Sequence, residues 1–489
     1  MKRIQNYLSS TPQNQQSAAA IAYMASLDEI EKKNPKIVES IEQELKDQRS
    51  YLKMIASENY CSYAVQLAMG NFMTDKYAEG FPGKRYYAGC DNVDHIEQLA
   101  VDEAKKLFGA EAAYVQPHSG ADANLVAFWS ILTHKVQQRE VERLGKKSLD
   151  ELTPQEFEKI RTLLNQQKVM GLSLSSGGHL THGYRMNVSA KMFHAVPYDV
   201  DPKTELLDYQ AIQEQAKREK PLILLAGYSA YPRKINFAKF KEIADSVGAV
   251  LMVDMAHFAG LVAGKAFTGE FNPIPYADVV TSTTHKTLRG PRGGLVLCTK
   301  EYEDVVNKGC PLVLGGPLPH VLAAKAVAFR EANAPEFSTY AKKVVENAKA
   351  LAHALTKKGL RIVSGDTENH LLVLDLTSSG LTGRQGETAL RQGHITVNRN
   401  SIPFDKNGAF FTSGLRLGTP ALTTLGMGVQ EMEEIAEIVH LILKNSTPQL
   451  QENGTPGRSH VDIKPEAVQE AHKRVKQLLT KFPLYPELP

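Results

Sequence analysis

Apolar runs and amphipathic segments alternate through the middle of the chain. Residues 112–115, 222–225, 249–253 and 277–280 have the apolar character of buried strands, and residues 236–247 have the spacing of an amphipathic helix. Strands that alternate with helices along the sequence are typical of a mostly parallel sheet covered on both faces. We therefore predict an α/β fold with a mostly parallel central sheet flanked by helices.

The pattern changes from about residue 335. The segments that follow predict a smaller α+β domain. Its expected helices are 337–358, 429–443 and 466–481, its expected strands are 371–374 and 415–417, and residues 449–465 are expected to form a loop.

Both the beginning of the chain and one internal segment are strongly polar. Residues 1–17 predict disorder, and Ser26 with Glu29 has the spacing of a capping box that opens a charged helix. Residues 135–168 predict a helical surface insertion. We divide the chain into an N-terminal arm and helix (1–50), a large domain (51–335) and a small C-terminal domain (336–489).

The composition narrows the class of partner. The chain has 489 residues, enough for two or three domains, and 57 Lys and Arg balance 54 Asp and Glu. This balance argues against nucleic acid and against a membrane surface, and the chain lacks a long apolar span, so we expect a small-molecule ligand. Four cysteines without paired spacing predict neither disulfides nor a metal site, and favour a cytoplasmic protein.

Lys286 stands at the end of a predicted strand, among small hydroxyl residues and beside His285. Burial disfavours the charged form of an amine, lowers its pKa and so favours the nucleophile that Schiff-base chemistry needs. A loop lysine whose head group reaches water is the alternative, and this segment alone does not separate the two.

Asp254 ends the predicted strand that precedes the one leading to Lys286. Consecutive parallel strands deliver their last residues to the same edge of a sheet, where ligands bind in open α/β folds. A carboxylate favours the protonated form of a pyridine nitrogen, and a lysine can hold an aldehyde as an imine, so the pair suits pyridoxal phosphate. Alternatively, Asp254 only caps the next helix.

Residues 116–120 (QPHSG) follow a strand and open a helix. The backbone N–H groups at a helix start, together with the Ser119 hydroxyl, can bind a phosphate. An ordinary helix cap at Ser119 and Gly120 is the alternative.

Six separated segments carry a further pattern. They are residues 55–60 (IASENY), 77–87 (YAEGFPGKRYY), 177–183 (GGHLTHG), 253–260 (VDMAHFAG), 283–294 (TTHKTLRGPRGG) and 413–420 (SGLRLGTP). Together they closely resemble the serine hydroxymethyltransferase family, over roughly residues 50–443. The resemblance implies fold type I of the pyridoxal-phosphate enzymes and the interconversion of serine plus tetrahydrofolate with glycine plus methylene-tetrahydrofolate. It also implies a homodimer with a shared active site, or a dimer of dimers.

The resemblance implies a set of cofactor-binding positions. Lys286 would hold the cofactor aldehyde, Asp254 would pair with the ring nitrogen, and His179 would stack on the ring. The other positions are Ser229 and His257 at the ring hydroxyl, and Ser119, Gly120 and His285 at the phosphate, with Tyr77 and Gly316 reaching in from a neighbouring subunit.

The resemblance also implies substrate-binding positions. Arg416 would grip the substrate carboxylate, which suits the two parallel hydrogen bonds of a guanidinium, and Ser57 would assist. Glu79 and Tyr87 would act as acid/base and positioning residues near the serine hydroxyl, and Thr283 belongs to the same catalytic set. The implied pterin contacts are Leu174, Gly178, Leu180 and Asn400.

Three features depart from the family pattern. Ala121 and Asp122 stand where a further serine would reach the phosphate, which predicts weaker retention of the cofactor. The loop 311–317 is less rich in glycine and glutamine than the family loop. The leading extension and the 135–168 insertion have no assigned role.

Two kinds of alternative stay open. Another fold type I enzyme, such as a threonine aldolase, an aminotransferase or a racemase, would share Lys286 and Asp254, and slow alanine racemisation is a plausible side activity. A catalytically inactive regulatory or RNA-binding relative is the other, and the charge balance and the intact Lys286, Asp254 and Arg416 argue against it.

Overall fold

The computed structural model describes residues 2–488, and its largest layer is a seven-stranded sheet with strand order β4-β10-β9-β8-β7-β5-β6. The five strands from β9 to β6 are parallel, whereas β10 runs antiparallel to both β9 and β4. The predicted α/β class with a mostly parallel sheet is therefore confirmed. The strands are β4 (Ala112–Tyr114), β5 (Lys168–Leu172), β6 (His194–Tyr198), β7 (Ile223–Gly227), β8 (Val250–Asp254), β9 (Val279–Thr283) and β10 (Gly294–Cys298).

The central strands are buried on both faces. Every residue of β7, β8 and β9 is buried, which is why these segments have continuous apolar sequences rather than alternating ones. Their side chains divide between two hydrophobic clusters, with Leu224 and Leu251 in one and Leu225 and Met252 in the other. All four strands predicted in this part of the chain are confirmed, although β9 continues to Thr283.

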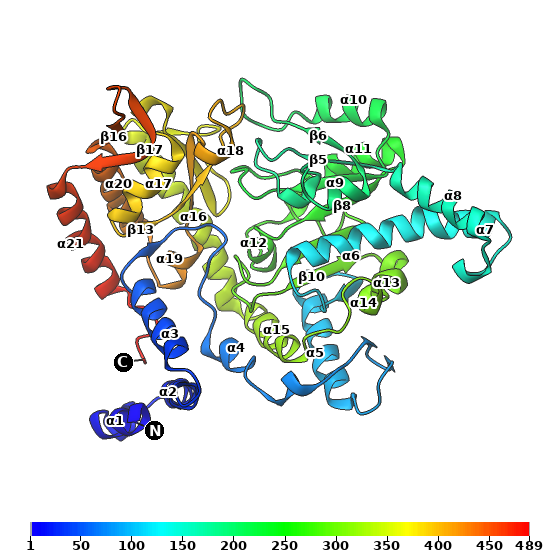
Figure 1. The fold of residues 1–489 in the computed structure, drawn as a ribbon, viewed down its shortest axis with the longest axis horizontal. Helices are drawn as coiled ribbons and strands as arrows, with labels where there is room; N and C mark the ends of the chain where they lie inside the picture. Colours follow the sequence, from blue (N-terminus) through cyan, green and yellow to red (C-terminus); the bar gives the residue numbers. More distant parts are fainter. Residues whose placement is uncertain (1, 489) are drawn as a thin grey trace.

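Helices cover both faces of this sheet (Figure 1). The predicted helix at 236–247 is confirmed as α11, and the Asn236 side chain caps it by accepting a hydrogen bond from the Lys239 N–H group. The helices are α5 (Asp91–Phe108), α6 (Gly120–Leu132), α10 (Tyr209–Glu219), α11 (Phe237–Val247), α12 (Ala259–Ala263), α13 (Lys300–Asn307) and α15 (Pro319–Ala332).

A second, antiparallel sheet with strand order β11-β12-β15-β14 forms the core of the C-terminal lobe. The strands and helices predicted there are confirmed, and Figure 1 shows them as the separate yellow to red lobe. Its strands are β11 (Arg361–Ile362), β12 (Leu371–Asp375), β14 (Asn398–Asn400) and β15 (Gly414–Gly418), and its longer helices are α16 (Pro335–Lys357), α17 (Gly383–Gln392), α20 (Val429–Lys444) and α21 (Pro465–Lys481).

One proposed domain boundary needs correction. Strand β1 (Leu52–Lys53) pairs with β13 (Ile395–Thr396), and Leu52 and Met54 lie in the hydrophobic cluster of the C-terminal lobe. The large domain therefore does not begin at residue 51, because the chain first contributes to the small domain.

The N-terminal arm is folded rather than disordered. Residues Lys2–Ser10 form α1, because Arg3 binds Glu31 and Glu42 and Tyr7 is buried, contacts that local composition does not reveal. The predicted capping box at Ser26 is also wrong. Ser26 lies inside α2 (Ala18–Glu31), which Ser17 caps, and α3 (Pro35–Gln48) follows.

Two other polar segments, residues 449–465 and 135–168, can be compared with their predictions. Residues 449–465 are not a simple loop, because β16 (Ser446–Leu450) and β17 (Pro456–Ile463) form an antiparallel hairpin. The insertion predicted at 135–168 is helical, as expected, with α7 (Gln138–Arg143) and α8 (Pro154–Asn165) projecting at the edge of the large domain (Figure 1).

Candidate active site

Asp254 and Lys286 lie at the carboxyl edge of the large sheet. Asp254 ends β8 and pairs in register with Thr281 of the neighbouring parallel strand, from which the chain continues to Lys286. The Lys286 Nζ atom donates a hydrogen bond of 3.3 Å to Thr283 Oγ1. Burial lowers the pKa of Lys286 to about 8, although the Asp254 carboxylate favours the charged form. The Lys286 head group is therefore partly buried against Thr283, which favours the interpretation as a reactive amine over that of a solvated loop lysine.

Asp254 is held as a carboxylate by several donors. Its Oδ2 atom accepts hydrogen bonds from Asn124 Nδ2 (2.9 Å) and from His182 Nε2 (3.2 Å), and Oδ1 accepts one from the Ala256 N–H group (3.0 Å). Burial alone would raise the pKa of Asp254, but these partners, with His182 first, lower it well below the usual range. The carboxylate thus carries a buried negative charge in addition to capping the Met255–Ala256 turn.

His179 lies next to this carboxylate network. Its Nδ1 atom accepts a hydrogen bond from the Thr181 N–H group (3.3 Å), and its ring is 5.9 Å from that of His182. Burial, reinforced by the charges of His182, Lys286 and Arg416, lowers the pKa of His179 to about 4 despite Asp254. A neutral ring is therefore present at neutral pH.

A second histidine pair joins the two domains. His257 Nδ1 lies 3.1 Å from Nε2 of His370, which precedes β12 of the small domain, and the rings are stacked with centroids 5.4 Å apart. Burial lowers the pKa of His257 well below its usual range and that of His370 to about 3. One neutral imidazole must donate to the other, so the pair fixes the orientation of His257.

Arg416 is a buried guanidinium with neutral partners. It projects from β15, and its Nε and Nη1 atoms donate to Asn398 Oδ1 (3.0 Å) and to the Ser229 carbonyl (2.6 Å). These bonds use two of the five donors of the side chain, and burial lowers its pKa to about 10. The geometry leaves donors for an anionic ligand.

The start of α6 combines several features that suit an anion. Ser119 is the N-cap, and its hydroxyl group donates to Asp122 Oδ2 (2.9 Å) while accepting from the Asp122 N–H group (3.2 Å). His285 directly precedes Lys286 in the sequence. Its buried Nδ1 atom has no hydrogen-bond partner among residues 2–488. Burial and the charge of Lys286 lower the pKa of His285 to about 3.

The loop 77–87 lies at the surface. The hydroxyl groups of Tyr77 and Tyr87 donate to the two carboxylate oxygens of Glu79, at 3.3 and 3.2 Å, and their rings meet edge to face with centroids 5.2 Å apart. Tyr77 is 59% exposed and Tyr87 is 45% exposed, and Gly316 packs against the Tyr77 ring of the same chain. The buried Arg85–Glu97 ion pair (2.6 Å) anchors this loop to α5.

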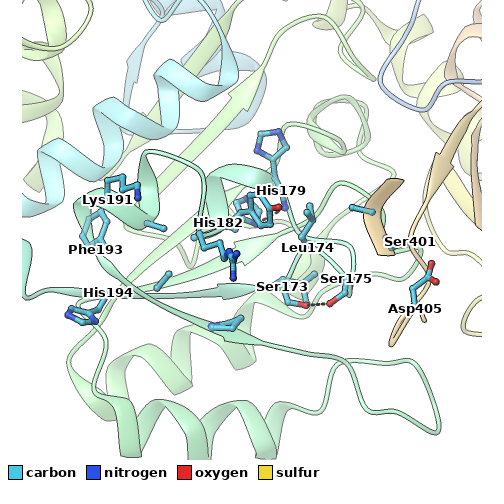
Figure 2. Close-up of a pocket in the computed structure, with 18 of the residues that line it drawn as sticks. Ser173, Leu174, Ser175, His179, His182, Lys191, Phe193, His194, Ser401 and Asp405 are labelled. Atoms are coloured by element: carbon cyan, nitrogen blue, oxygen red, sulfur yellow. Dashed lines mark hydrogen bonds between the residues drawn. The ribbon is translucent and has the colours of Figure 1, made fainter. Parts of the chain in front are cut away.

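A cavity of about 800 Å³ lies beside His179 and His182. His179, His182 and Leu174 contribute to its lining, and residues of the small domain close one side. Figure 2 shows His179 and His182 between two groups of lining residues, with Lys191, Phe193 and His194 on one side and Ser173, Leu174, Ser175, Ser401 and Asp405 on the other.

The remaining expected pterin positions lie around the same loops. Gly178 has no room for a side chain, because a Cβ atom there would lie 2.0 Å from the Leu172 carbonyl oxygen. Leu180 is 44% exposed, and Asn400 ends β14 next to Ser401. Ser57 is half-buried in the segment between β1 and α4 (Tyr63–Leu67).

Sequence reasoning missed four residues that organise this site. Asn124 and His182 bind Asp254, His370 binds His257, and Asn59 Nδ2 donates to the Lys286 carbonyl (3.0 Å). His182 and Asn59 lie within two of the six segments (177–183 and 55–60), so both were visible as parts of motifs, although their partners were not. Asn124 and His370 lie outside these segments and their partners are far away in sequence, so no local pattern marks them.

Comparison with known proteins gives consistent results. The sequence profile described as "Serine hydroxymethyltransferase" matches residues 30–141 and 153–439. The serine hydroxymethyltransferase of Treponema pallidum (strain Nichols) is 58% identical over 482 residues, which cover 99% of this chain and 84% of that protein. The Chlamydia muridarum protein of the same name is 58% identical over 475 residues (97% and 96% coverage), and that of Salinispora tropica is 54% identical over 472 residues (96% and 99%).

Proposed function

The chain belongs to the serine hydroxymethyltransferase family, and from this premise we propose which of its own residues carry out the reaction. The protein is an enzyme that interconverts serine plus tetrahydrofolate with glycine plus methylene-tetrahydrofolate. The expected family and activity are confirmed, and the comparisons do not favour the aldolase or racemase alternatives.

The residues present fit pyridoxal phosphate, the cofactor of this family. An aldehyde needs an amine of lowered pKa, which Lys286 supplies, and a pyridinium nitrogen needs a buried carboxylate, which Asp254 supplies. The unpartnered Nδ1 atom of His285 and the capped start of α6 suit a phosphate. We assign the phosphate to Ser119, Gly120 and His285, the ring hydroxyl to Ser229 and His257, and the ring face to His179.

When bound there, pyridoxal phosphate supplies an electron sink for the bond that breaks at the substrate α-carbon. Asp254 keeps its negative charge at the ring nitrogen because Asn124 and His182 hold both its position and its ionised state. Thr283 accepts a hydrogen bond from the Lys286 amine and so orients it at the edge of the sheet.

Arg416 binds the substrate carboxylate in this proposal. Two hydrogen bonds to Asn398 and Ser229 fix its position, and its remaining donors form the planar fork that matches a carboxylate. Ser57 assists from the segment that follows β1. Because the carboxylate is held in a fixed plane, the arginine selects which α-bond of the amino acid is broken.

Glu79 moves the proton at the serine hydroxyl group. Tyr77 and Tyr87 hold both oxygens of its carboxylate, and Tyr87 also positions the hydroxyl group of the substrate. This loop is exposed in the single chain, together with other large apolar side chains: Phe72 (90%), Tyr86 (71%) and Leu312 (65%). We propose that a second copy of the chain covers this surface, so that Glu79, Tyr87, Tyr77 and Gly316 act in the site of the neighbouring subunit.

The cavity beside His179 is the proposed site of the pterin. Leu174 lines this cavity and offers apolar contact. Gly178 and Leu180 flank the lining residue His179, and Asn400 precedes the lining residue Ser401, so in this proposal they add close backbone approach, apolar contact and an amide for the polar edge of the ring. Its volume of about 800 Å³ is within the range of small-molecule sites.

One observation carries this assignment: the buried Asp254 carboxylate ends β8, the partly buried Lys286 amine follows the end of the neighbouring parallel strand β9, and the partly buried Arg416 guanidinium lies close enough to lower the pKa of Lys286. We expect Lys286→Ala to lower serine cleavage with tetrahydrofolate at least about 1,000-fold. The variant should also lose the visible absorbance of the protein-bound imine.

The exposed lysine Lys300, at the start of α13, provides a matched control. Lys300→Ala should keep both the absorbance and the rate. Serine cleavage by Lys286→Ala at a rate close to that of the unmodified enzyme would contradict the assignment of Lys286.

No helix of the part of the chain described here has the length and apolar character to cross a membrane. The cytoplasmic location stays a prediction, as does the choice between a dimer and a dimer of dimers.

A further inference from the structure

Lys325 is a buried lysine that the proposed reaction does not use. It lies in the middle of α15, and only 1% of its surface is exposed. Its Nζ atom donates to three backbone carbonyl oxygens, those of Val115 (2.5 Å), Pro117 (2.9 Å) and Gly294 (2.8 Å). An ammonium group has three donors and no acceptor, so this arrangement matches the protonated side chain.

These carbonyl groups belong to two segments that meet at the start of α6. Val115 and Pro117 lie between β4 and the N-cap Ser119, and Gly294 opens β10. The Gly294 N–H group also donates to the Pro117 carbonyl at 2.8 Å. The Lys325 ammonium group thus binds both segments, and it holds in place the turn that presents Ser119 and Gly120.

The positive charge of Lys325 has no carboxylate as a hydrogen-bond partner, since its three acceptors are neutral. The carboxylates that favour its charged form are Glu97 and Asp122, and each already has another partner. Glu97 pairs with Arg85 at 2.6 Å, and Asp122 accepts from the Ser119 hydroxyl group at 2.9 Å. A buried cation is costly unless an anion compensates it, and the start of α6 is where an anion would also meet a helix dipole.

We propose that Lys325 is a positioning residue for the phosphate of pyridoxal phosphate. Its ammonium group fixes the 115–119 and 293–294 segments against each other, and it supplies positive charge below the phosphate site. This inference rests on the proposed function, because it takes the phosphate to bind at Ser119 and Gly120.

The test compares two ligands that differ only in the phosphate group. Equilibrium dialysis of the full-length protein gives the dissociation constants of pyridoxal phosphate and of pyridoxal. For Lys325→Met, which keeps the length of the side chain and removes its charge, we expect pyridoxal phosphate to bind about 30-fold more weakly. The affinity for pyridoxal should change less than about threefold.

A fluorescence readout is independent of catalysis. The single tryptophan of the chain, Trp129, lies on α6. Titration with inorganic phosphate should change its emission in the unmodified protein, and this response should be lost in Lys325→Met.

If Lys325→Met does not fold, a second variant tests the role of the same ammonium group. A Cβ atom at Gly293 would lie 2.5 Å from Lys325 Cε, so Gly293→Ala displaces the ammonium group without removing it. We expect about a fivefold loss of affinity for pyridoxal phosphate and none for pyridoxal. Phe329→Leu, on the same helix and in the hydrophobic core, is the control that lowers stability and leaves the ratio of the two affinities unchanged.

The outcomes separate the two proposals. Equal weakening of both ligands, or no change in either, in the folded variants would overturn the role of Lys325. An unmodified protein that binds neither ligand would instead overturn the proposed cofactor site.

Discussion

Lys286 is partly buried and Lys325 is fully buried, and their surroundings give them different chemistry. Lys286 has one hydroxyl acceptor at 3.3 Å, whereas Lys325 has three carbonyl acceptors. Burial lowers the pKa of both, to about 8 for Lys286, while the Glu97 and Asp122 carboxylates favour the charged form of Lys325. An amine with one weak partner is available for reaction, while the loss of a proton from Lys325 would leave a carbonyl group unpaired.

The pKa of Lys286 predicts how cofactor capture depends on pH. Only the uncharged amine attacks an aldehyde, so the capture rate should rise about tenfold per pH unit and level off above about pH 8. The rate is measured by trapping bound pyridoxal phosphate with borohydride over a pH series. Asp254 raises the pKa of Lys286, so Asp254→Asn should move the midpoint to lower pH, and an unchanged midpoint would count against this electrostatic account.

The residues after Gly120 predict how cofactor affinity can be improved. The Ser119 hydroxyl group donates to Asp122, so a phosphate at the start of α6 must compete with that carboxylate. Ala121→Ser should add a donor and tighten binding of pyridoxal phosphate by about three- to tenfold. Asp122→Asn should act in the same direction by removing the negative charge, and dialysis measures both. If Ala121→Ser does not tighten binding, the hypothesis of weakened retention fails.

Residues that bear the chemistry were more predictable than residues that hold them. Lys286, Asp254 and Arg416 are recognisable because strand ends and short motifs mark them. Asn124, Asn59 and His370 act through contacts between distant parts of the chain, and their side chains are common in ordinary loops and helices. Their roles depend on the folded geometry, so the sequence alone could not assign them.

At the scale of elements, the N-terminal arm is held by ion pairs together with a small hydrophobic cluster that includes Tyr7, Ala20 and Met24. Arg3 bridges from α1 to Glu31 of α2 and to Glu42 of α3, at 2.9 and 2.8 Å. We expect Arg3→Met to speed hydrogen exchange in α1 severalfold and to leave serine kinetics unchanged. Lys2→Met, on the same helix, is the control, and equal exchange in both variants would show that Arg3 does not anchor the arm.

Burial explains only part of which elements could be predicted, since the buried strands β5 and β10 were not predicted. Strands β7, β8 and β9 lie in the middle of the sheet and have continuous apolar sequences, so they were found. Strand β6 lies at the edge of the sheet, and its half-exposed sequence (HAVPY) carries a weaker signal. The β16–β17 hairpin is polar and mostly exposed, and it resembles a loop in composition.

At the scale of the whole molecule, the proposed active site lies where the two lobes of the chain meet. Arg416 of the small domain binds the Ser229 carbonyl of the large domain at 2.6 Å, and His370 meets His257 at 3.1 Å. Neither domain contains all of the proposed site residues. Correct assembly of the domains is therefore a condition for binding both the cofactor and the amino acid.

The shared site proposed for two subunits predicts complementation between inactive variants. Lys286→Ala and Glu79→Gln should each be inactive alone, yet a mixture that has exchanged subunits should regain about a quarter of the activity. Each mixed dimer then holds one site without either substitution. The measurement is the rate after mixing, with Lys286→Ala mixed with itself as the control, and a lack of recovery despite subunit exchange would place Glu79 in the site of its own chain.

The missing space at Gly178 has a consequence for resistance to inhibitors. Any side chain there would overlap the Leu172 carbonyl oxygen, so this backbone, which joins the cavity-lining residues 172–175 to His179, tolerates no substitution at Gly178. Lys191 and His194, on the other side of the cavity, are exposed and free to change. A drug that contacts Lys191 or His194 would therefore select resistant variants readily, whereas one held by the 177–178 backbone would leave the enzyme few routes of escape.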